Sequence, residues 1–386
     1  DTGSYFTVFG QIVILLLIQI GGLGLMTVTT FFALIAGKNI TVRESLLMSN
    51  VFNIKSLSRV SNLIMSTLAL TFSFEFIGFL LLSIAWSGEF GLGTRLYYSL
   101  FHSVSAFCNA GFSLFSNSLE NYKDNLAINV IITLLIIFGG LGFITIVNLL
   151  HYFRFRILKK ERLTLHTKIV LLVTGSLIIT GTLVILIVEW NNSLMDLPIF
   201  TKFLASYFHS VTPRTAGFNT IDMSSLTNAC YFIIIILMFI GASPGGTGGG
   251  IKTSTFGVFL ANIWSMLKGR TQVEIFRRSI PKDIVTSALL LTTLTLMLLS
   301  VFAFVLLITE NLMPIQIFFE LFSAFGTVGL STGITSSLTT IGKLIIIATM
   351  FIGRVGPLTL MLAISQIRQR RGSIEYEYPE ESVIVG

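Results

Sequence analysis

Long apolar stretches separated by short polar loops dominate this chain. A helix needs about 20 apolar residues to cross the ~30 Å hydrocarbon core of a bilayer. The stretches that meet this requirement are residues 11–36, 63–86, 126–150, 168–188, 229–266, 284–308 and 338–365. The pattern therefore predicts an all-α, multi-pass membrane protein.

Three further apolar segments, near residues 95–107, 198–212 and 314–326, are too short to cross the membrane. Each of them lies between two full-length stretches. This placement is typical of a re-entrant half-helix, which enters the bilayer and returns on the same side. We therefore expect units that consist of a helix, a half-helix and a second helix.

A similar turn follows each half-helix, at residues 105–112, 210–218 and 323–330, and each turn contains a glycine. Irregular backbone at membrane depth is tolerated only where it lines protein or water, and a ring of backbone carbonyls on one axis forms a cation filter. The predicted carbonyl donors are Cys108, Asn109, Ala110, Thr215, Ala216, Thr327 and Val328, with Gly111, Gly217 and Gly329 shaping the turns.

We predict that the unit occurs four times and that its first copy is incomplete. The end of repeat 1 covers residues 1–36, repeats 2 to 4 cover 63–150, 168–266 and 284–365, and a cytoplasmic tail covers 366–386. The predicted fold is thus a pseudo-fourfold repeat of helix, re-entrant pore helix and helix around a central ion pore.

Internal matches support this repeat. The sequence Gly-Gly-Leu-Gly occurs in two of the predicted spans, and 24 residues separate Gly217 from Gly241 as well as Gly329 from Gly353. Glycine in membrane helices often only permits close helix packing. We favour this packing interpretation for the first two glycines in each copy of the motif, which are Gly21, Gly22, Gly139 and Gly140.

Residues 241–254 form a glycine-rich stretch in the middle of a predicted span. Its glycines and Pro244 cannot sustain a helix, so we expect an unwound loop beneath the filter that acts as a gate. A phosphate-binding loop would need glycine directly before the lysine, where this chain has Ile251, and no strand precedes the segment. The predicted gate residues are Gly241, Ser243, Gly245, Gly246, Thr247, Gly248, Gly249, Gly250 and Lys252.

Arg354 lies in the middle of the last predicted span. An intramembrane arginine costs about 2.5–3.5 kcal/mol and needs a partner in protein or water. We interpret it as part of the gate, where it would repel cations below the filter; the alternative is a structural arginine that caps backbone groups. Arg214, in the turn at 210–218, is expected at the outer mouth, whereas Glu75, a lone acid inside a span, has no assigned role.

Composition and charge agree with a membrane protein, since 53% of residues are hydrophobic and only 11% are charged. Basic residues gather in loops that share one side of the predicted topology, which the positive-inside rule makes cytoplasmic. These loops are residues 37–60, 152–168, 268–282 and the end of the last span. Nucleic-acid binding is a poor interpretation of this pattern, and Cys108 and Cys230 have no zinc-type spacing. The residues before position 11 do not form the basic region of a signal peptide.

The filter turns and the glycine-rich stretch together resemble the Trk/Ktr/HKT superfamily of K⁺ uptake proteins. The resemblance is carried by Thr-Ala-Gly-Phe-Asn-Thr at 215–220, Thr-Val-Gly-Leu-Ser-Thr at 327–332 and Gly-Ala-Ser-Pro-Gly-Gly-Thr-Gly-Gly-Gly-Ile-Lys-Thr at 241–253. Within the superfamily the chain is most similar to the membrane subunit of the bacterial Ktr system, over essentially its whole length.

This resemblance implies a subunit for channel-like K⁺ uptake across the plasma membrane, with K⁺ bound by filter carbonyls and no organic cofactor. It also implies a homodimer and an octameric cytoplasmic ring of nucleotide-binding regulatory subunits that controls the gate, and it leaves a dependence on Na⁺ open. Residues 1–3 look like the segment that trails the first filter turn, so that turn is expected upstream.

Two other classes of protein remain as alternatives. A secondary cation symporter with alternating access would suit the broken helix at 241–253. Three re-entrant turns on one side argue against it, because inverted repeats would place such loops on opposite sides. A membrane-embedded enzyme is disfavoured, because the sequence shows no nucleophile–base pair and no acid cluster.

Overall fold

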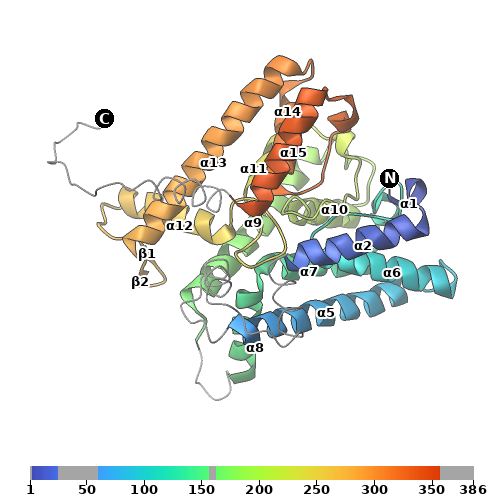
Figure 1. The fold of residues 1–386 in the computed structure, drawn as a ribbon, viewed down its shortest axis with the longest axis horizontal. Coiled ribbons are helices and arrows are strands. Elements are labelled where there is room, and N and C mark those ends of the chain that lie inside the picture. Colours follow the sequence, from blue (N-terminus) through green and yellow to red (C-terminus); the bar gives the residue numbers. More distant parts are fainter. Residues whose placement is uncertain (1, 25–59, 156–161, 357–386) are drawn as a thin grey trace, which may run out of the picture.

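The computed structural model describes residues 2–24, 60–155 and 162–356, and this part of the chain is predominantly helical, as predicted (Figure 1). The α-helices are α1 Thr2–Tyr5, α2 Val8–Leu23, α5 Val60–Ala85, α6 Leu92–Phe107, α7 Leu126–Leu141, α8 Phe143–Phe155, α9 Leu165–Glu189, α10 Ile199–Val211, α11 Asn228–Phe239, α12 Thr253–Leu267, α13 Lys282–Thr309, α14 Pro314–Gly326 and α15 Thr340–Val355. An antiparallel hairpin, β1 Glu274–Ile275 and β2 Arg278–Ser279, joins α12 to α13 and was not expected from the sequence. The predicted tail at 366–386 lies outside the described residues.

Three of the described helices are long and apolar enough to cross a membrane by themselves: residues 64–85 of α5, and the whole of α9 and α13. They coincide with the predicted spans 63–86, 168–188 and 284–308. Helices α2 and α15 cover those parts of the first and last predicted spans that belong to the described residues.

The predicted span 126–150 is bent: α7 and α8 together are long and apolar enough for one span, but they do not form one straight helix. Helices α7 and α8 meet at an angle of 103° around Gly142. Gly142 has φ +83° and ψ +139°, a conformation that a right-handed helix cannot contain and that glycine adopts without a Cβ clash. Gly24 after α2 and Gly356 after α15 have nearly the same dihedral angles, so three helices end in the same way.

The predicted span 229–266 consists of two helices, α11 and α12. The intervening residues 240–252 contain a parallel bridge between Ile240 and Ile251 and no helical turn. This segment carries the glycines and the proline that oppose helix formation.

The C-terminal halves of the three half-helices α6, α10 and α14 are buried between the longer helices. Gly91 precedes α6, Pro198 precedes α10, and Pro314 is the first residue of α14. Proline is favoured in a first helical turn, because the N–H that it lacks would have no partner there. Helix α6 packs between α5 and α7, α10 packs on α9, and α14 packs against α11, α13 and α15.

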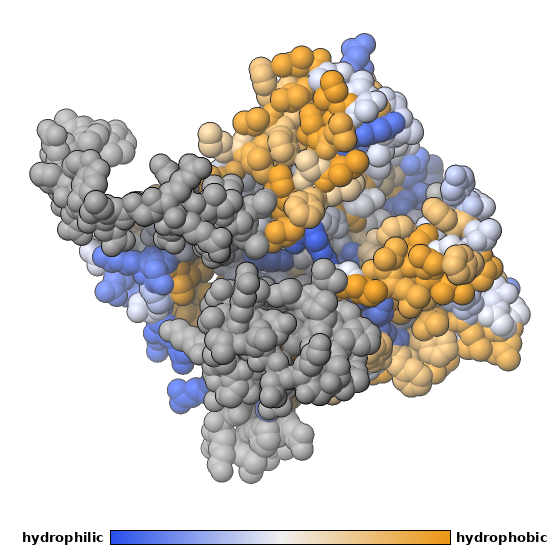
Figure 2. Space-filling view, viewed as in Figure 1, coloured by the Kyte–Doolittle hydropathy of each residue, from blue (hydrophilic) through white to orange (hydrophobic). Residues whose placement is uncertain are grey.

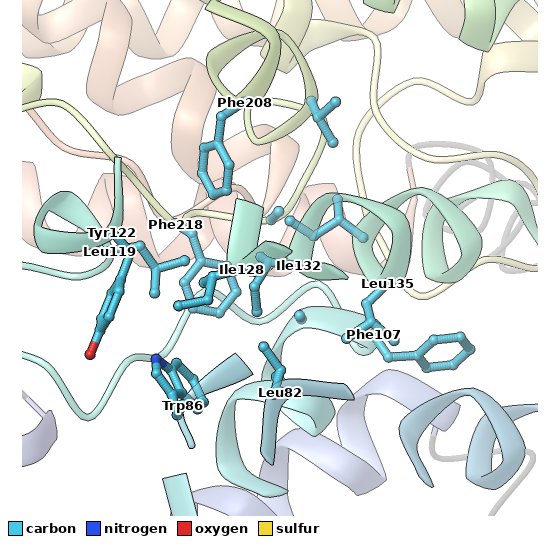
Figure 3. Packing of buried hydrophobic residues seen from close by; sticks show 14 of the residues in the cluster. Leu82, Trp86, Phe107, Leu119, Tyr122, Ile128, Ile132, Leu135, Phe208 and Phe218 are labelled. Atoms are coloured by element: carbon cyan, nitrogen blue, oxygen red, sulfur yellow. The ribbon is translucent and has the colours of Figure 1, made fainter. Parts of the chain in front are cut away.

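The largest apolar cluster lies between α5, α6, α7 and α10 and fixes where two of the half-helices end (Figure 3). Trp86, Phe107, Phe208 and Phe218 are fully buried in it. Each buried aromatic side chain removes a large apolar area from solvent, so the cluster holds the half-helix ends rigidly.

The outward faces of the helices are strongly apolar. Figure 2 shows apolar residues gathered over α13 and α15 and over α2 and α6, whereas hydrophilic residues gather around the β1–β2 hairpin. Ile187, Met297 and Phe304, for example, are more than 60% exposed. Contiguous apolar surface of this extent marks a surface that water does not cover, such as one that faces lipid.

Candidate functional site

The turns after α6, α10 and α14 share one backbone conformation. In each turn the glycine and the residue two positions before it have positive φ values. These residues are Asn109 (52°) with Gly111 (72°), Thr215 (80°) with Gly217 (86°), and Thr327 (52°) with Gly329 (91°). A β-branched residue rarely has positive φ, so the surrounding contacts must hold Thr215 and Thr327 in this strained state.

The glycines of the three turns lie next to one another. A Cβ atom placed on Gly111 would lie 2.9 Å from Gly217 Cα and 2.4 Å from the carbonyl oxygen of Ala216. One placed on Gly217 would lie 2.3 Å from the carbonyl oxygen of Val328, and one on Gly329 would lie 3.9 Å from Gly217 Cα. Backbone oxygens from different turns therefore converge on the same small volume, and no side chain fits at Gly111 or Gly217.

Two side chains reinforce this convergence. The amide group of Asn109, which is buried, lies 3.2 Å from the hydroxyl of Thr215 and links the first turn to the second. The thiol of Cys108 lies 3.6 Å from the Glu75 carboxylate, which also accepts a hydrogen bond of 3.0 Å from Gln19. Glu75 thereby connects α2 with the first turn, a contact that the sequence did not suggest.

Residues 240–252 fold back on themselves as a closed loop. The amide of Gly241 donates to the carbonyl of Ile251 at 2.9 Å, and the amide of Ala242 donates to that of Gly249 at 3.2 Å. Gly245 and Gly250 both have φ +70°, which lets the loop reverse twice. The Ser243 and Thr253 hydroxyls, 2.7 Å apart, close its base.

This loop lies directly against two of the filter turns. The amide of Gly249 donates to the Thr327 hydroxyl at 3.0 Å, and a Cβ on Gly248 would lie 2.0 Å from the Thr215 hydroxyl. The hydroxyl of Thr247 donates to the carbonyl of Phe107, the last residue of α6, at 3.3 Å. The sequence predicted a loop beneath the filter, and these contacts bring its residues within hydrogen-bond distance of the candidate filter residues.

The end of helix α7 also forms backbone hydrogen bonds with this loop. The carbonyl of Gly140 accepts the amide of Ser243 at 2.8 Å, and that of Gly139 accepts the amide of Thr247 at 3.1 Å. A Cβ on Gly139 would lie only 1.9 Å from the carbonyl oxygen of Phe107, so close packing does apply to Gly139. For Gly21, by contrast, no atom of the described residues lies within 4 Å of such a Cβ.

Arg354 joins the loop to both ends of the described chain. Its guanidinium donates to the carbonyl of Thr247 and to the carbonyl of Gly21, which belongs to α2. The ammonium group of Lys252 donates to the carbonyl of Gly248 at 2.7 Å. Both cations therefore bind backbone oxygens, a contact common to the barrier and the structural interpretation of Arg354.

Arg214 does not lie at an outer mouth, so that prediction was wrong. The residue is buried, and its guanidinium donates to the hydroxyl of Thr174 at 3.3 Å, in the first half of α9. The half-helix α10 ends in the interior of the molecule, and Arg214 follows directly after this end. Glu320, in α14, accepts hydrogen bonds from Ser331 and from Thr335 and so supports the third turn from behind.

Several residues of this site were not predicted from the sequence. Gly24, Gly142 and Gly356 end helices α2, α7 and α15. Each of them follows a glycine of the helix that it ends by three positions. That recurrent spacing was the available signal. The described residues contain no cluster of His, Cys, Asp and Glu that could hold a metal ion.

Long apolar helices that enclose converging backbone turns are typical of an integral membrane transport protein. A family model described as TrkH, cation transport protein, matches residues 2–373, and the chain belongs to this family. It is accordingly a multi-pass membrane transport protein of the Trk/Ktr superfamily and not an enzyme.

Individual relatives place the chain more narrowly within this family. Over its whole length it is 42% identical to Ktr system potassium uptake protein B of Bacillus subtilis (strain 168), of which it covers 85%. It is 40% identical to potassium/sodium uptake protein NtpJ of Enterococcus hirae, again covering 85% of that protein. The potassium transporter TrkH of Vibrio parahaemolyticus has a similar fold, with a TM-score of 0.63 and 18% identity over 90% of this chain and 70% of that one.

Proposed function

We propose that this protein is a K⁺ translocation subunit that conducts K⁺ through a channel-like pore in the plasma membrane. The observation that carries the proposal is the convergence of three glycine turns with the same alternating φ signs. The names of the relatives, which are potassium uptake proteins, support K⁺ as the ion. K⁺ is the only bound species that the proposal requires.

In this proposal the residues before each glycine bind dehydrated K⁺ through their carbonyl oxygens. A cation that leaves water needs replacement oxygens, and a glycine with positive φ allows three turns to approach one axis. The proposed filter residues are Cys108, Asn109, Ala110, Gly111, Thr215, Ala216, Gly217, Thr327, Val328 and Gly329.

The loop at 241–252 serves as the gate beneath this filter. Its hydrogen bonds to Thr327 and to the end of α6 support a position directly on the conduction path. Arg354 and Lys252 place two positive charges beside the loop, and their repulsion raises the barrier for a cation while the loop stays closed. Movement of the loop away from the turns would open the path.

The wider assembly extends the same proposal. The three described turns and the incomplete first repeat form a pseudo-fourfold pore, in the repeats 1–36, 63–150, 168–266 and 284–365. Two such chains form a homodimer, and the basic loops and the tail at 366–386 face a cytoplasmic ring of nucleotide-binding regulatory subunits. A relative named for a Ktr system supports this partnership, and one named for potassium and sodium uptake supports a test of Na⁺ dependence.

Flux measurements test the proposal against a secondary cation symporter with alternating access. The full-length protein is reconstituted into phosphatidylethanolamine–phosphatidylglycerol vesicles, and ⁸⁶Rb⁺ uptake is followed down its own gradient. A pore passes Rb⁺ without an obligatory second ion, whereas a symporter needs a coupling ion in a fixed ratio. Uptake that stops whenever Na⁺ and H⁺ gradients are removed would favour the symporter.

A further inference from the structure

Each filter turn is hydrogen-bonded on both sides of its glycine to a single residue, which lies in the last turn of the pore helix or directly after its end. In the first turn, the backbone carbonyl of Ser105 accepts the amide of Ala110 at 2.9 Å. The hydroxyl of the same Ser105 donates to the carbonyl of Phe112 at 2.7 Å. Gly111 lies between these two attachment points, so its position is fixed by one serine.

The other two turns repeat this arrangement with different residues. The hydroxyl-to-carbonyl bonds are Thr212 to Phe218 and Ser323 to Leu330, both at 2.6 Å. The amide-to-carbonyl bonds are Ala216 to Thr212 and Val328 to Ser323, both at 2.9 Å. In each turn one amide donor precedes the glycine, and in the second turn the amide of Gly217 also donates to Thr212 at 3.4 Å. The carbonyl bound by the hydroxyl always follows the glycine.

Sequence position alone does not identify the residue in the second turn. Ser210 begins the second copy of the repeated turn as Ser105 begins the first, but its hydroxyl donates to the carbonyl of Ile178 on α9 at 2.8 Å. In α6 the equivalent of Ser210 is Ser103, whose hydroxyl donates to the carbonyl of Glu75 on α5 at 2.6 Å. Both half-helices thus carry two hydroxyls two positions apart, the first bound to a long helix and the second to the filter turn.

We propose that Ser105, Thr212 and Ser323 form a hydroxyl clamp that determines the ion preference of the filter. The inference rests on the proposed function. Each hydroxyl bond occupies the carbonyl after the glycine, so that this oxygen is satisfied by protein and the carbonyls before the glycine remain to bind the cation. The clamp residues are almost completely buried, with at most 4% exposure, so water cannot replace a lost hydroxyl without disturbing the turn.

Paired substitutions test the clamp. S105A, T212V and S323A remove the hydroxyls, S105T, T212S and S323T keep them, and S103A and S210A remove neighbouring hydroxyls that do not touch a filter turn. The full-length variants are reconstituted in the vesicles described above. The measured quantity is the Na⁺ concentration that halves ⁸⁶Rb⁺ uptake, divided by the Rb⁺ concentration for half-maximal uptake.

The clamp predicts that this ratio falls about tenfold when a clamp hydroxyl is removed, because a buried carbonyl then loses its partner. The hydroxyl-keeping variants and the two controls should stay within about twofold of the unmodified protein, because the carbonyl after each glycine keeps its hydrogen-bond partner. Ratios for the clamp variants that equal those of S103A and S210A would overturn the clamp while leaving the pore intact. No ⁸⁶Rb⁺ uptake by the unmodified protein would overturn the proposed function and the clamp with it.

A second set of variants covers the case in which an alanine or valine protein does not fold. S105C and S323C replace each hydroxyl with a thiol, a weaker hydrogen-bond donor of similar size. The ratio of Na⁺ to Rb⁺ concentrations is then expected to fall below that of the unmodified protein, because the thiol donates a weaker hydrogen bond. A ratio unchanged in both thiol variants contradicts the proposal.

Discussion

Replacing Gly217 by alanine gives the sharpest test of the converging turns. The new methyl group would lie 2.3 Å from the carbonyl oxygen of Val328 and 3.3 Å from Gly111 Cα. Contacts of carbon with oxygen below ~3.0 Å are sterically forbidden, so the Val328 oxygen has to retreat by about 0.7 Å. The left-handed φ of +86° adds a further cost of about 1–2 kcal/mol for a residue with a Cβ.

The displaced oxygen is a proposed K⁺ ligand, so G217A should reduce the preference for Rb⁺ over Na⁺ by about tenfold, which corresponds to ~1.4 kcal/mol. The assay is Na⁺ competition against ⁸⁶Rb⁺ uptake in proteoliposomes. Two glycines serve as matched controls because they share the left-handed φ but not the crowding. Gly329 has φ +91° with its nearest contact at 3.9 Å, and Gly333 has φ +92° with no atom of the described residues within 4 Å.

The expected order of the effect on ion preference is therefore G217A, then G329A, then G333A with nearly none. A series in which all three variants behave alike would mean that backbone strain alone matters and that the turns do not meet. An unchanged preference in G217A, with the protein correctly inserted, would refute the assignment of Val328 as a ligand.

Three other predictions concern Arg354 beside the gate loop, Gly142 at the bend after α7, and Glu310, which binds the N-cap residue of α15. R354A removes the hydrogen bonds to Thr247 and Gly21, and basal ⁸⁶Rb⁺ flux should rise about tenfold because a charge barrier is lost; flux at or below the unmodified level would contradict the gate. G142A would place a methyl group 2.4 Å from the carbonyl oxygen of Pro244 at φ +83°, and it should likewise raise basal flux, whereas G175A, with nothing within 4 Å, should not. Burial raises the pKa of Glu310, but hydrogen bonds from Thr339 outweigh burial and hold this pKa below its ordinary value. The resulting stabilisation is present above the unfolded pKa of about 4.3 and is lost as pH falls through the folded value. Thermal unfolding of E310Q in detergent should thus show a lower melting temperature at pH 7 and a smaller drop between pH 6 and pH 3; equal pH profiles would exclude Glu310 as the source.

Much of the helical architecture follows from the hydrophobic pattern because membrane spans and half-helices differ in length. The boundaries of α5, α9 and α13 lie within a few residues of the predicted spans. The three glycine turns could also be located from the sequence. A glycine shortly after a short apolar segment indicates a position that requires positive φ, because glycine is the residue that adopts it without a steric cost.

The bend at Gly142 and the burial of Arg214 could not be obtained from the same pattern. Residues on both sides of Gly142 are apolar, so hydropathy continues through the break although the backbone does not. The position of Arg214 depends on where α10 ends in three dimensions, which local sequence does not encode. For the same reason Thr212, and not Ser210, holds the second turn, although the sequence offers both hydroxyls.

The hydrogen bond from Arg354 to Gly21 joins groups that are 333 positions apart in the sequence. No peptide bond joins α2 and α15 at this point, so a side chain holds the end of α2 beside α15. A hydrogen bond breaks far more readily than a covalent link, and separation of these two helices is therefore expected to begin at this contact.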